Sequence, residues 1–368
     1  MKLRRLTGLL LSLVLLFCTG CSQSAAPRSA PSPTAEEQAL SSPPEASAKA
    51  PSDQQAEEKT VSAEKNAPAP AQEVSFTLCA YLPVSSMTQG AAAVAEEYAG
   101  SIAALDYLVL NTGAYWDENG ALSLSDELLD AIETLQGKTA LWCTVNPQGA
   151  LIREGTAGQS IDSPQERQAL AQEIAAFAEQ YGLAGIDIDW EFPLDDEWED
   201  FSTFLITLKD TLSRSSEPVA LSLALYPEEI ALSEEAIAAL DRIHVMAYDQ
   251  FDSEGFHSTM QAAEDAVAYF TALGASPQQL VLGIPAYGRP LDGSAQWVFY
   301  KDIDPESISG ENPDLVGDIS FNSAATAAQK TQYALEQNLG GVMVYQLLCD
   351  RNDQDALILA CANMAENA

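Results

Sequence analysis

Eight short apolar segments, each followed by a stretch of helical periodicity, recur along the chain from about residue 75 to its end. The short segments are β-branched and apolar, as strands buried on both faces are, and the longer stretches carry apolar residues every three or four positions. The predicted strands are Phe76–Tyr81, Tyr107–Thr112, Thr139–Val145, Gly185–Glu191, Val219–Tyr226, Arg242–Tyr248, Leu280–Ala286 and Gly341–Leu347. The predicted helices lie near Ala91–Ile102, Asp126–Leu135, Pro164–Tyr181, Asp196–Ser213, Ser233–Ala239, Met260–Leu273, Ala324–Asn338 and Asp353–Met364. Eight strand–helix units in roughly 290 residues predict a (β/α)8 TIM barrel.

An open, doubly wound sheet is the alternative for alternating strands and helices. The glycine-rich phosphate fingerprint of many such sheets is absent from the sequence, and the eight-fold rhythm favours the barrel. A barrel gathers its functional residues at the carboxyl ends of its strands. The residues near those ends are mostly tyrosines and polar groups: Tyr81, Asn146, Glu191, Tyr226, Met246, Tyr248, Asp249, Tyr287, Arg289, Tyr345 and Gln346. Aromatic rings and hydrogen-bonding groups on one rim suit a sugar.

The predicted fourth strand carries three acids in alternation. Successive side chains on a strand point to opposite faces, so Asp187, Asp189 and Glu191 share one face and the apolar residues between them share the other. A half-buried strand with a solvated acidic face is one interpretation, and it would apply in an antiparallel sheet. Here helices precede and follow the strand, so we expect a parallel sheet covered on both faces.

Three carboxyl groups crowded into such an interior repel one another and lose hydration, so at least one takes up a proton near neutral pH. A carboxylic acid held beside ionised neighbours is what glycosidic bond cleavage requires, because the leaving oxygen must receive a proton. The pattern therefore favours a glycoside-cleaving site over a solvated strand face.

The run Ala184–Pro193 resembles the D-G-x-D-x-D-x-E signature of glycoside hydrolase family 18, which includes chitinases and endo-β-N-acetylglucosaminidases. Its last three acidic positions match Asp187, Asp189 and Glu191, whereas Ala184 occupies the first. Three later runs resemble further family motifs: Met246–Asp249 (M-x-Y-D), Leu282–Arg289 (G-[IV]-P-x-Y-G-R) and Gly340–Tyr345 (G-G-V-M-x-W). Tyr345 stands where a Trp is usual, and Thr144-Val145-Asn146 replaces the usual Ser-x-Gly-Gly of strand three. The resemblance spans nearly the whole predicted barrel.

The resemblance implies a substrate-assisted, retaining reaction in which the sugar's own 2-acetamido oxygen attacks the anomeric carbon. Glu191 would be the acid and then the base, and Asp189 would orient the acetamido group and balance the charge on it. Asp187 would share a proton from beneath. Tyr248 would donate a hydrogen bond to the acetamido oxygen, and Asp249 would hold the sugar. The remaining predicted substrate-binding residues are Tyr81, Asn146, Trp190, Met246, Tyr287, Tyr345 and Gln346.

Charge and metal-ligand patterns exclude several other functions. The chain has 17 basic and 54 acidic residues, which argues against nucleic acids and anionic surfaces as partners. Only two histidines, His244 and His257, occur, without metal-ligand spacing or a serine elbow, so zinc and Ser-His-Asp chemistry are poor candidates. Cys79 and Cys143 lie within predicted strands and are expected to be core residues. We predict no cofactor or metal, and a monomer that binds an N-acetylglucosamine-containing glycan.

The first 21 residues resemble an export signal. Lys2, Arg4 and Arg5 precede an apolar run, and the sequence Cys18-Thr19-Gly20-Cys21 resembles a bacterial lipoprotein cleavage box. We predict that residues 1–21 are a signal peptide with Cys21 as the lipidated residue, so that the protein is extracellular and membrane-anchored. Residues 22–73, rich in Ala, Pro, Ser and Glu, are predicted to be a disordered linker, and residues 74–368 the catalytic domain.

Several substrates remain open. The leading prediction is chitinase-like cleavage of β-1,4 bonds next to N-acetylglucosamine, with N-glycan cores and peptidoglycan as alternatives. A catalytically silent sugar-binding relative is the non-enzymatic alternative, although Glu191 is present. A transporter-feeding lipoprotein would need two lobes, which the eight-fold rhythm opposes. The segment from Arg289 to about Asn322 is too short for the larger α+β subdomain of processive chitinases, so we expect an open groove and endo-type cleavage.

Overall fold

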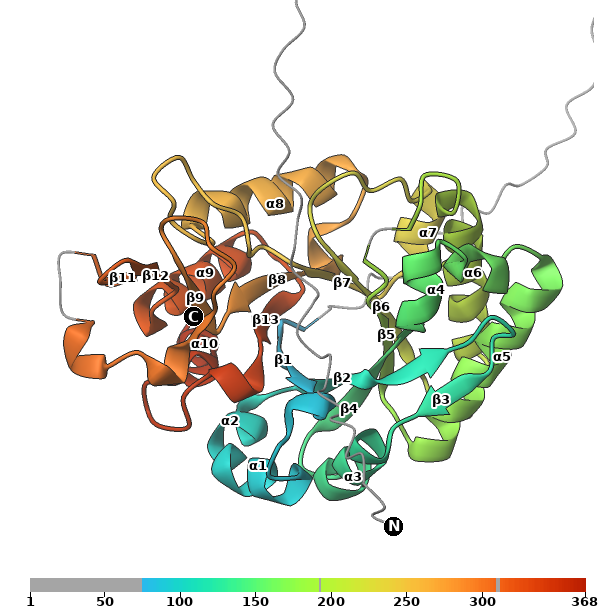
Figure 1. Ribbon diagram of the computed structural model, residues 1–368, viewed down its shortest axis with the longest axis horizontal. Coiled ribbons are helices and arrows are strands. Elements are labelled where there is room, and N and C mark those ends of the chain that lie inside the picture. Colours follow the sequence, from blue (N-terminus) through green and yellow to red (C-terminus); the bar gives the residue numbers. More distant parts are fainter. Residues whose placement is uncertain (1–74, 192, 309–311) are drawn as a thin grey trace, which may run out of the picture. The chain divides into compact units, whose positions relative to one another are not determined.

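The computed structural model describes residues 75–191, 193–308 and 312–368, which form the predicted (β/α)8 barrel (Figure 1). The predicted signal peptide and linker, residues 1–73, lie outside the described residues. Within the described residues, no helix is long and apolar enough to cross a membrane.

Eight parallel strands close the barrel. They are β1 (Thr77–Pro83), β2 (Tyr107–Trp116), β4 (Ala140–Pro147), β5 (Gly185–Ile188), β6 (Ala220–Leu225), β7 (Arg242–Val245), β8 (Leu280–Pro285) and β13 (Gly341–Tyr345). Each pairs in parallel with the next, and β1 pairs with both β2 and β13, which closes the sheet on itself. All eight predicted strands are therefore confirmed. β2 also extends beyond the barrel to pair with β3 (Leu122–Leu124) as an antiparallel hairpin.

The acid-bearing strand ends earlier than the sequence predicts. We expected a strand to Glu191, but β5 ends at Ile188, its last residue paired with β6. The backbone N–H of Asp189 donates instead to the side-chain oxygen of Asn146, at 2.8 Å. The side chain of Asn146 on β4 thus supplies the hydrogen bond that a neighbouring strand would otherwise make. Asp189 and Glu191 follow β5 rather than belonging to it.

Helices cover the outside of the barrel (Figure 1). They are α1 (Ala91–Glu97), α2 (Ala99–Ala104), α3 (Asp126–Leu135), α4 (Gly149–Glu154), α5 (Pro164–Tyr181), α6 (Trp198–Leu212), α7 (Glu234–Ala239), α8 (Met260–Ala272), α9 (Ala324–Glu336) and α10 (Leu357–Glu366). The helix that leads into the acid strand has strong end signals: Ser163 and Glu166 form a capping box, and Gly182 ends the helix with a φ of 62°. The predicted single helix at Ala91–Ile102 is two helices that meet at Tyr98.

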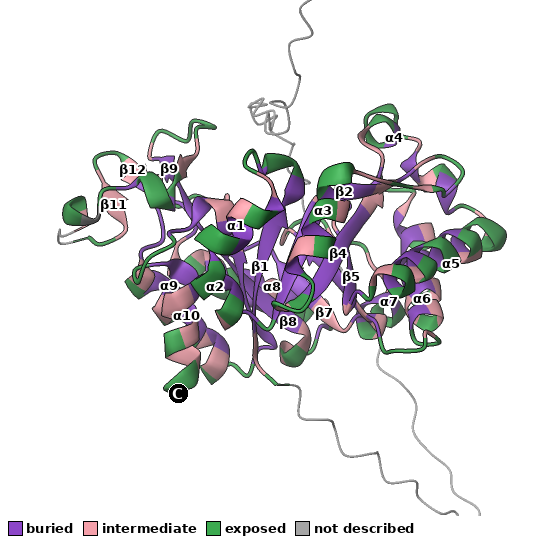
Figure 2. Cartoon of the chain, turned by 90° about the horizontal axis from the view of Figure 1, so that it is seen from below, coloured by how far each residue is buried: buried purple, intermediate pink, exposed green. Residues whose placement is uncertain are grey.

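Two buried layers flank the strands, which Figure 2 shows as mostly buried. One layer lies between strands and helices, and the other fills the barrel interior with Cys79, Tyr81, Tyr107, Val109, Trp142, Met246, Tyr248, Val281 and Met343. Gly185 leaves room for this filling, because a Cβ there would lie 2.1 Å from a ring atom of Trp142. The described cysteines, Cys79, Cys143, Cys349 and Cys361, are all buried and free, as predicted for the first two.

A small antiparallel sheet follows the seventh barrel strand. It consists of β10 (Val298–Phe299), β9 (Tyr287–Pro290), β12 (Ile319–Ser320) and β11 (Leu315–Val316), in that spatial order. The sequence analysis predicted no strands in this segment. Its described residues contain only short 3-10 turns besides these strands. The sheet carries Tyr287, Arg289 and Trp297 to the mouth of the barrel.

Candidate active site

The three predicted acids lie together at the carboxyl end of β5, and each is more exposed to solvent than the one before it in the chain. Asp187 is completely buried, Asp189 is partly buried and Glu191 reaches solvent. The strand therefore places Asp187 in the interior, and the chain that follows it brings Glu191 to the open mouth, as a proton-transferring site requires.

Hydroxyl groups from three other barrel strands, β1, β4 and β6, surround the deepest acid. The Asp187 carboxylate accepts hydrogen bonds from Tyr81 Oη at 2.8 Å and Thr144 Oγ1 at 3.0 Å, both to Oδ2. Ser222 Oγ donates to the other oxygen, Oδ1, at 2.5 Å. Both carboxylate oxygens of Asp187 are therefore occupied by protein donors. Sequence reasoning did not identify Thr144 or Ser222 as functional, since lone hydroxyl residues within a strand carry no distinctive signal.

The middle acid has the opposite surroundings. The side-chain atom Asp189 Oδ1 is buried and has no hydrogen-bond partner. Burial, followed by the charges of Glu191 and Asp187, raises the pKa of Asp189 well above its ordinary value. Burial and two neighbouring acids thus favour the protonated form of Asp189, which is the direction expected for crowded carboxyl groups.

The outermost acid faces a recess. Burial by surrounding protein atoms and the charge of Asp249 raise the pKa of Glu191. The lining of the recess beside it includes Trp190, Trp198, Tyr226, Glu228 and Met246. A solvent-accessible carboxyl group that keeps its proton to higher pH is suited to act as a general acid.

Aromatic side chains form the opposite wall of the site. Tyr248 stacks on Tyr345 with ring centroids 5.5 Å apart. Tyr287 stacks on Trp297 at 3.8 Å with the rings 5° from parallel, and Trp297 meets Tyr345 edge to face at 6.3 Å. Sequence reasoning missed Trp297, because it lies in the loop before β10, beyond the last residue of the strand-seven motif. An aromatic residue in a short polar insertion was the available signal.

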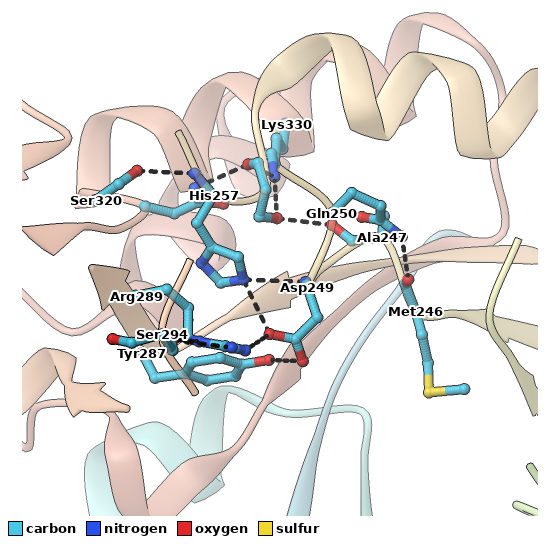
Figure 3. Close-up of polar contacts among 12 residues, drawn as sticks. Met246, Ala247, Asp249, Gln250, His257, Tyr287, Arg289, Ser294, Ser320 and Lys330 are labelled. Atoms are coloured by element: carbon cyan, nitrogen blue, oxygen red, sulfur yellow. Dashed lines mark hydrogen bonds and ion pairs between the residues drawn. The ribbon is translucent and has the colours of Figure 1, made fainter. Parts of the chain in front are cut away.

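Asp249 is held by protein donors rather than left free (Figure 3). Its carboxylate accepts a hydrogen bond from Tyr287 Oη at 2.8 Å and forms an ion pair with Arg289. The imidazole of His257 accepts the backbone N–H of Asp249 at 3.0 Å. Burial alone would raise the pKa of Asp249, but His257, Tyr287 and Arg289 together bring this pKa below its ordinary value. A sugar hydroxyl would thus meet a carboxylate whose charge is already balanced.

Three residues that we predicted to contact substrate lie deeper than expected: Tyr81, Trp190 and Tyr287, the last of which is 1% exposed and stacked against Trp297. Tyr81 is 2% exposed, and its hydroxyl contacts Asp187 beneath the mouth. Trp190 is 1% exposed and packs edge to face on Phe201, with ring centroids 5.0 Å apart. The interpretation of Tyr81 as a cleft-lining residue is therefore corrected: the hydroxyl of a strand-end tyrosine that turns inward is satisfied by a buried acid.

The other predicted residues occupy the rim. Asn146 holds the backbone of Asp189, and Met246 lies in the recess wall and is 8% exposed. Gln346 accepts the N–H of Leu348 at 2.8 Å and so caps the turn after β13. Within the part of the chain that the structure describes, no cluster of three or more His, Cys, Asp or Glu side chains is arranged to hold a metal ion.

Known proteins resemble this chain in both sequence and fold. Chitinase 1 of Aphanocladium album is 24% identical over 252 residues, which covers 54% of this chain and 60% of that protein. The chain spans less than two thirds of the length of the curated relatives it matches best. A chitinase structure from Bacteroides thetaiotaomicron aligns with a TM-score of 0.65 at 21% identity, covering 79% of this chain and 96% of that one. A Cycas revoluta chitinase in complex with (GlcNAc)3 aligns with a TM-score of 0.60 at 21% identity, covering 78% and 99%. These structural likenesses support the barrel fold.

The family comparison covers most of the chain. The model of the family Glycosyl hydrolases family 18 matches residues 57–350, a range that contains the acid strand and all three later strand-end motifs. The chain belongs to glycosyl hydrolase family 18.

Proposed function

We propose that the protein hydrolyses β-1,4 glycosidic bonds next to N-acetylglucosamine, with retention of configuration and with the substrate's acetamido group as nucleophile. The observation that carries this proposal is the graded set of acids: Asp187 surrounded by donors, Asp189 buried beside two acids with a raised pKa, and Glu191 accessible with a raised pKa. A two-carboxylate retaining enzyme would use a protein nucleophile in its ionised form beside the sugar. The raised pKa of Asp189 makes it poorly suited to that role.

In the proposed reaction, the acetamido oxygen attacks the anomeric carbon as the bond to the leaving oxygen breaks. Glu191 transfers its proton to that oxygen, and the sugar becomes a cyclic oxazolinium ion. The protonated Asp189 orients the acetamido group and, with Asp187, supplies the negative charge that balances the ion. Water then attacks the anomeric carbon while Glu191 removes its proton, which restores both the acetamido group and the acid.

The substrate class is supported by the aromatic wall and by relatives. Tyr248, Tyr345 and Trp297 offer ring faces and a hydroxyl to a sugar with an acetamido group. The Cycas revoluta structure named above contains an N-acetylglucosamine trimer. We favour chitin-like oligomers over N-glycan cores and peptidoglycan, and endo-type cleavage over release from chain ends.

One assay tests these alternatives together. The chain is incubated with chitooligosaccharides, a high-mannose glycoprotein and peptidoglycan, and the products are identified by mass spectrometry and by their anomeric configuration. We expect β-anomeric chitooligosaccharide fragments of several lengths. An α-anomeric product would refute retention, and disaccharides alone would refute endo cleavage. Binding of all three glycans without cleavage would support the catalytically silent alternative.

We also propose that the protein is exported and anchored to a bacterial membrane through lipidated Cys21, as a monomer. The proposal is supported by the basic residues, apolar run and cysteine box of the first 21 residues. Cells producing the chain are treated with globomycin, which blocks lipoprotein signal cleavage. With globomycin, we expect the uncleaved precursor to accumulate. In the variant Cys21→Ala, we expect lipid labelling to be lost. Unchanged processing in both experiments would refute the anchor.

A further inference from the structure

His244 lies in the barrel interior directly beneath the acids, and it contacts no solvent. Its Nδ1 atom lies 2.7 Å from Tyr81 Oη and 3.3 Å from Asp187 Oδ1. Its Nε2 atom lies 2.9 Å from Tyr107 Oη. The ring packs close to Tyr107 and Trp142, with centroid distances of 5.9 and 6.0 Å, which restricts its orientation. Both nitrogens of a fully buried imidazole are thus hydrogen-bonded, and one of them borders the deepest acid.

The hydrogen bonds form a chain with a preferred direction. Tyr81 has one hydroxyl proton, and it donates this proton to Asp187 only if its oxygen accepts from His244 Nδ1–H. An imidazole that carries its proton on Nδ1 has a free lone pair on Nε2, which Tyr107 Oη–H satisfies. With the proton on Nε2 instead, Nδ1 would accept from Tyr81, and Asp187 would lose a donor.

We propose that His244 is a positioning residue that holds its proton on Nδ1, turns the hydroxyl of Tyr81 toward Asp187, and so keeps all three hydroxyl donors on the Asp187 carboxylate. The catalytic consequence of this inference rests on the proposed hydrolase function. Asp187 and Asp189 can balance the charge of the oxazolinium ion only if the two carboxyl groups together hold fewer than two protons. His244 touches neither the substrate nor the reacting atoms. It acts through Tyr81.

Several other ionisable groups lie near His244, and their charges would respond to its loss. The titratable and charged groups that face it are Cys79 and Tyr81 from β1, Tyr107 from β2, Asp187 from β5 and Arg242 from its own strand β7. The residue facing it from β4, Trp142, carries no charge. Arg242 attracts negative charge in the lower layer, around Cys79 and Tyr107, whereas Asp187 borders His244 on the upper side.

The first test measures the imidazole itself and needs no activity. The chain contains only two histidines, so ¹⁵N-histidine labelling gives two imidazole spin systems, and the variant His244→Asn identifies those of His244. We expect a protonated Nδ1 for His244 at pH 5 to 7. A neutral imidazole with its proton on Nε2 would overturn the proposal, whether or not the protein cleaves any glycan.

The second test compares His244→Leu with His244→Asn. The Asn amide nitrogen replaces the Nδ1 donor, whereas Leu has similar size and no donor. We expect the acidic limb of the kcat/KM–pH profile to move to higher pH by about one unit in His244→Leu, since the Asp187 carboxylate then loses the Nδ1–H group 3.3 Å from its Oδ1 and the donor that polarises the Tyr81 hydroxyl. The Asn variant should return the limb to within a few tenths of a unit of its original position.

A structural role alone would reduce the amount of folded enzyme at every pH and leave the limb in place. Circular dichroism melts show whether both variants are folded at the assay temperature. Equal shifts in the two variants, or no shift in a folded His244→Leu, would overturn the proposal. Failure of the wild-type chain to cleave any glycan would refute the proposed function instead, and the nitrogen spectra would still decide the role of His244.

Discussion

Two aspartates at the barrel mouth, Asp189 after β5 and Asp249 after β7, share the same side chain but have opposite surroundings. Asp189 has a buried oxygen without a partner and lies beside two other acids. Asp249 accepts a hydrogen bond from Tyr287 and pairs with Arg289. The pKa of Asp189 lies well above its ordinary value and that of Asp249 below it. The surroundings at one mouth thus favour the protonated form of Asp189 and the ionised form of Asp249.

The difference shows that hydrogen-bond and charge partners, rather than residue type, determine the role of each acid at the barrel mouth. The surroundings on both sides of the mouth affect the pKa of Glu191. Burial raises its pKa first, and the fixed charge of Asp249 raises it further. The anion on the β7 side therefore helps the acid on the β5 side to keep the proton that it must transfer.

Removing the acid itself should have the largest effect. In Glu191→Gln, we expect hydrolysis of chitooligosaccharides to fall about 1,000-fold or more, because the leaving oxygen no longer receives a proton. Glu228→Gln is the matched control, since Glu228 lines the same recess. It should retain most activity. A Glu191→Gln variant that is folded and still turns over substrate would remove Glu191 from its proposed role.

Substitutions in the aromatic wall should weaken sugar binding without changing proton transfer. In Trp297→Ala, we expect KM to rise about 10-fold with a smaller change in kcat, because a ring face worth roughly 1 kcal/mol is lost to the sugar. The pH profile should stay in place, since Trp297 contacts none of the acids. Phe299→Ala, on the neighbouring strand β10 and 38% exposed, is the control. An unchanged KM in Trp297→Ala would exclude this ring from the binding site.

The sequence predicted the barrel and the acid triad because both are periodic: eight strand–helix units, and carboxyl groups at every second residue of one strand. Family motifs pointed to Tyr248, Asp249 and Tyr287. The inward turn of Tyr81 was not predictable from the sequence, because a strand-end tyrosine can point into the core or toward the mouth with equal local propensity.

The contacts of Ser222 and His244 were unpredictable for a different reason. Both lie on strands other than β5 and meet Asp187 only through strand pairing: Ser222 lies opposite Asp187 on β6, and His244 lies on the next strand, β7. Trp297 illustrates the same limit, since β9 and β10 must pair before its ring stacks on Tyr287. Features built from long-range contacts between single residues leave no periodic trace in the chain.

Neutralising the fixed anion should affect Glu191 at a distance. Glu191 acts as an acid only while protonated, so activity is lost as the pH rises through its pKa. In Asp249→Asn, the loss of a neighbouring negative charge lowers the pKa of Glu191, and we expect the basic limb of the kcat–pH profile to move to lower pH by up to about one unit. Asp195→Asn, in the recess wall, is the control and should leave the limb unchanged. A shift to higher pH would contradict the coupling.

The smallest effect should appear in the pH dependence of stability, where the two aspartates have opposite signs. Asp189 has a raised pKa when folded, so its folded form binds more protons than its unfolded form, and its destabilising contribution grows as the pH rises above about 4. Asp249 has a lowered pKa when folded, so its stabilising contribution is present above about 4 and lost as the pH falls. At pH 8, we therefore expect Asp189→Asn to melt above the wild-type chain and Asp249→Asn below it, each by about 2 °C or more. At pH 4, the Asp189 difference should shrink, because the unfolded form of Asp189 also takes up a proton there. The Asp249 difference should only begin to fall at that pH, since its folded pKa lies lower. Thermal melts of the three proteins at both pH values measure this. Differences of the same sign at pH 8 would mean that the two carboxyl groups do not differ in protonation, and the division of roles between the two sides of the mouth would fail with them.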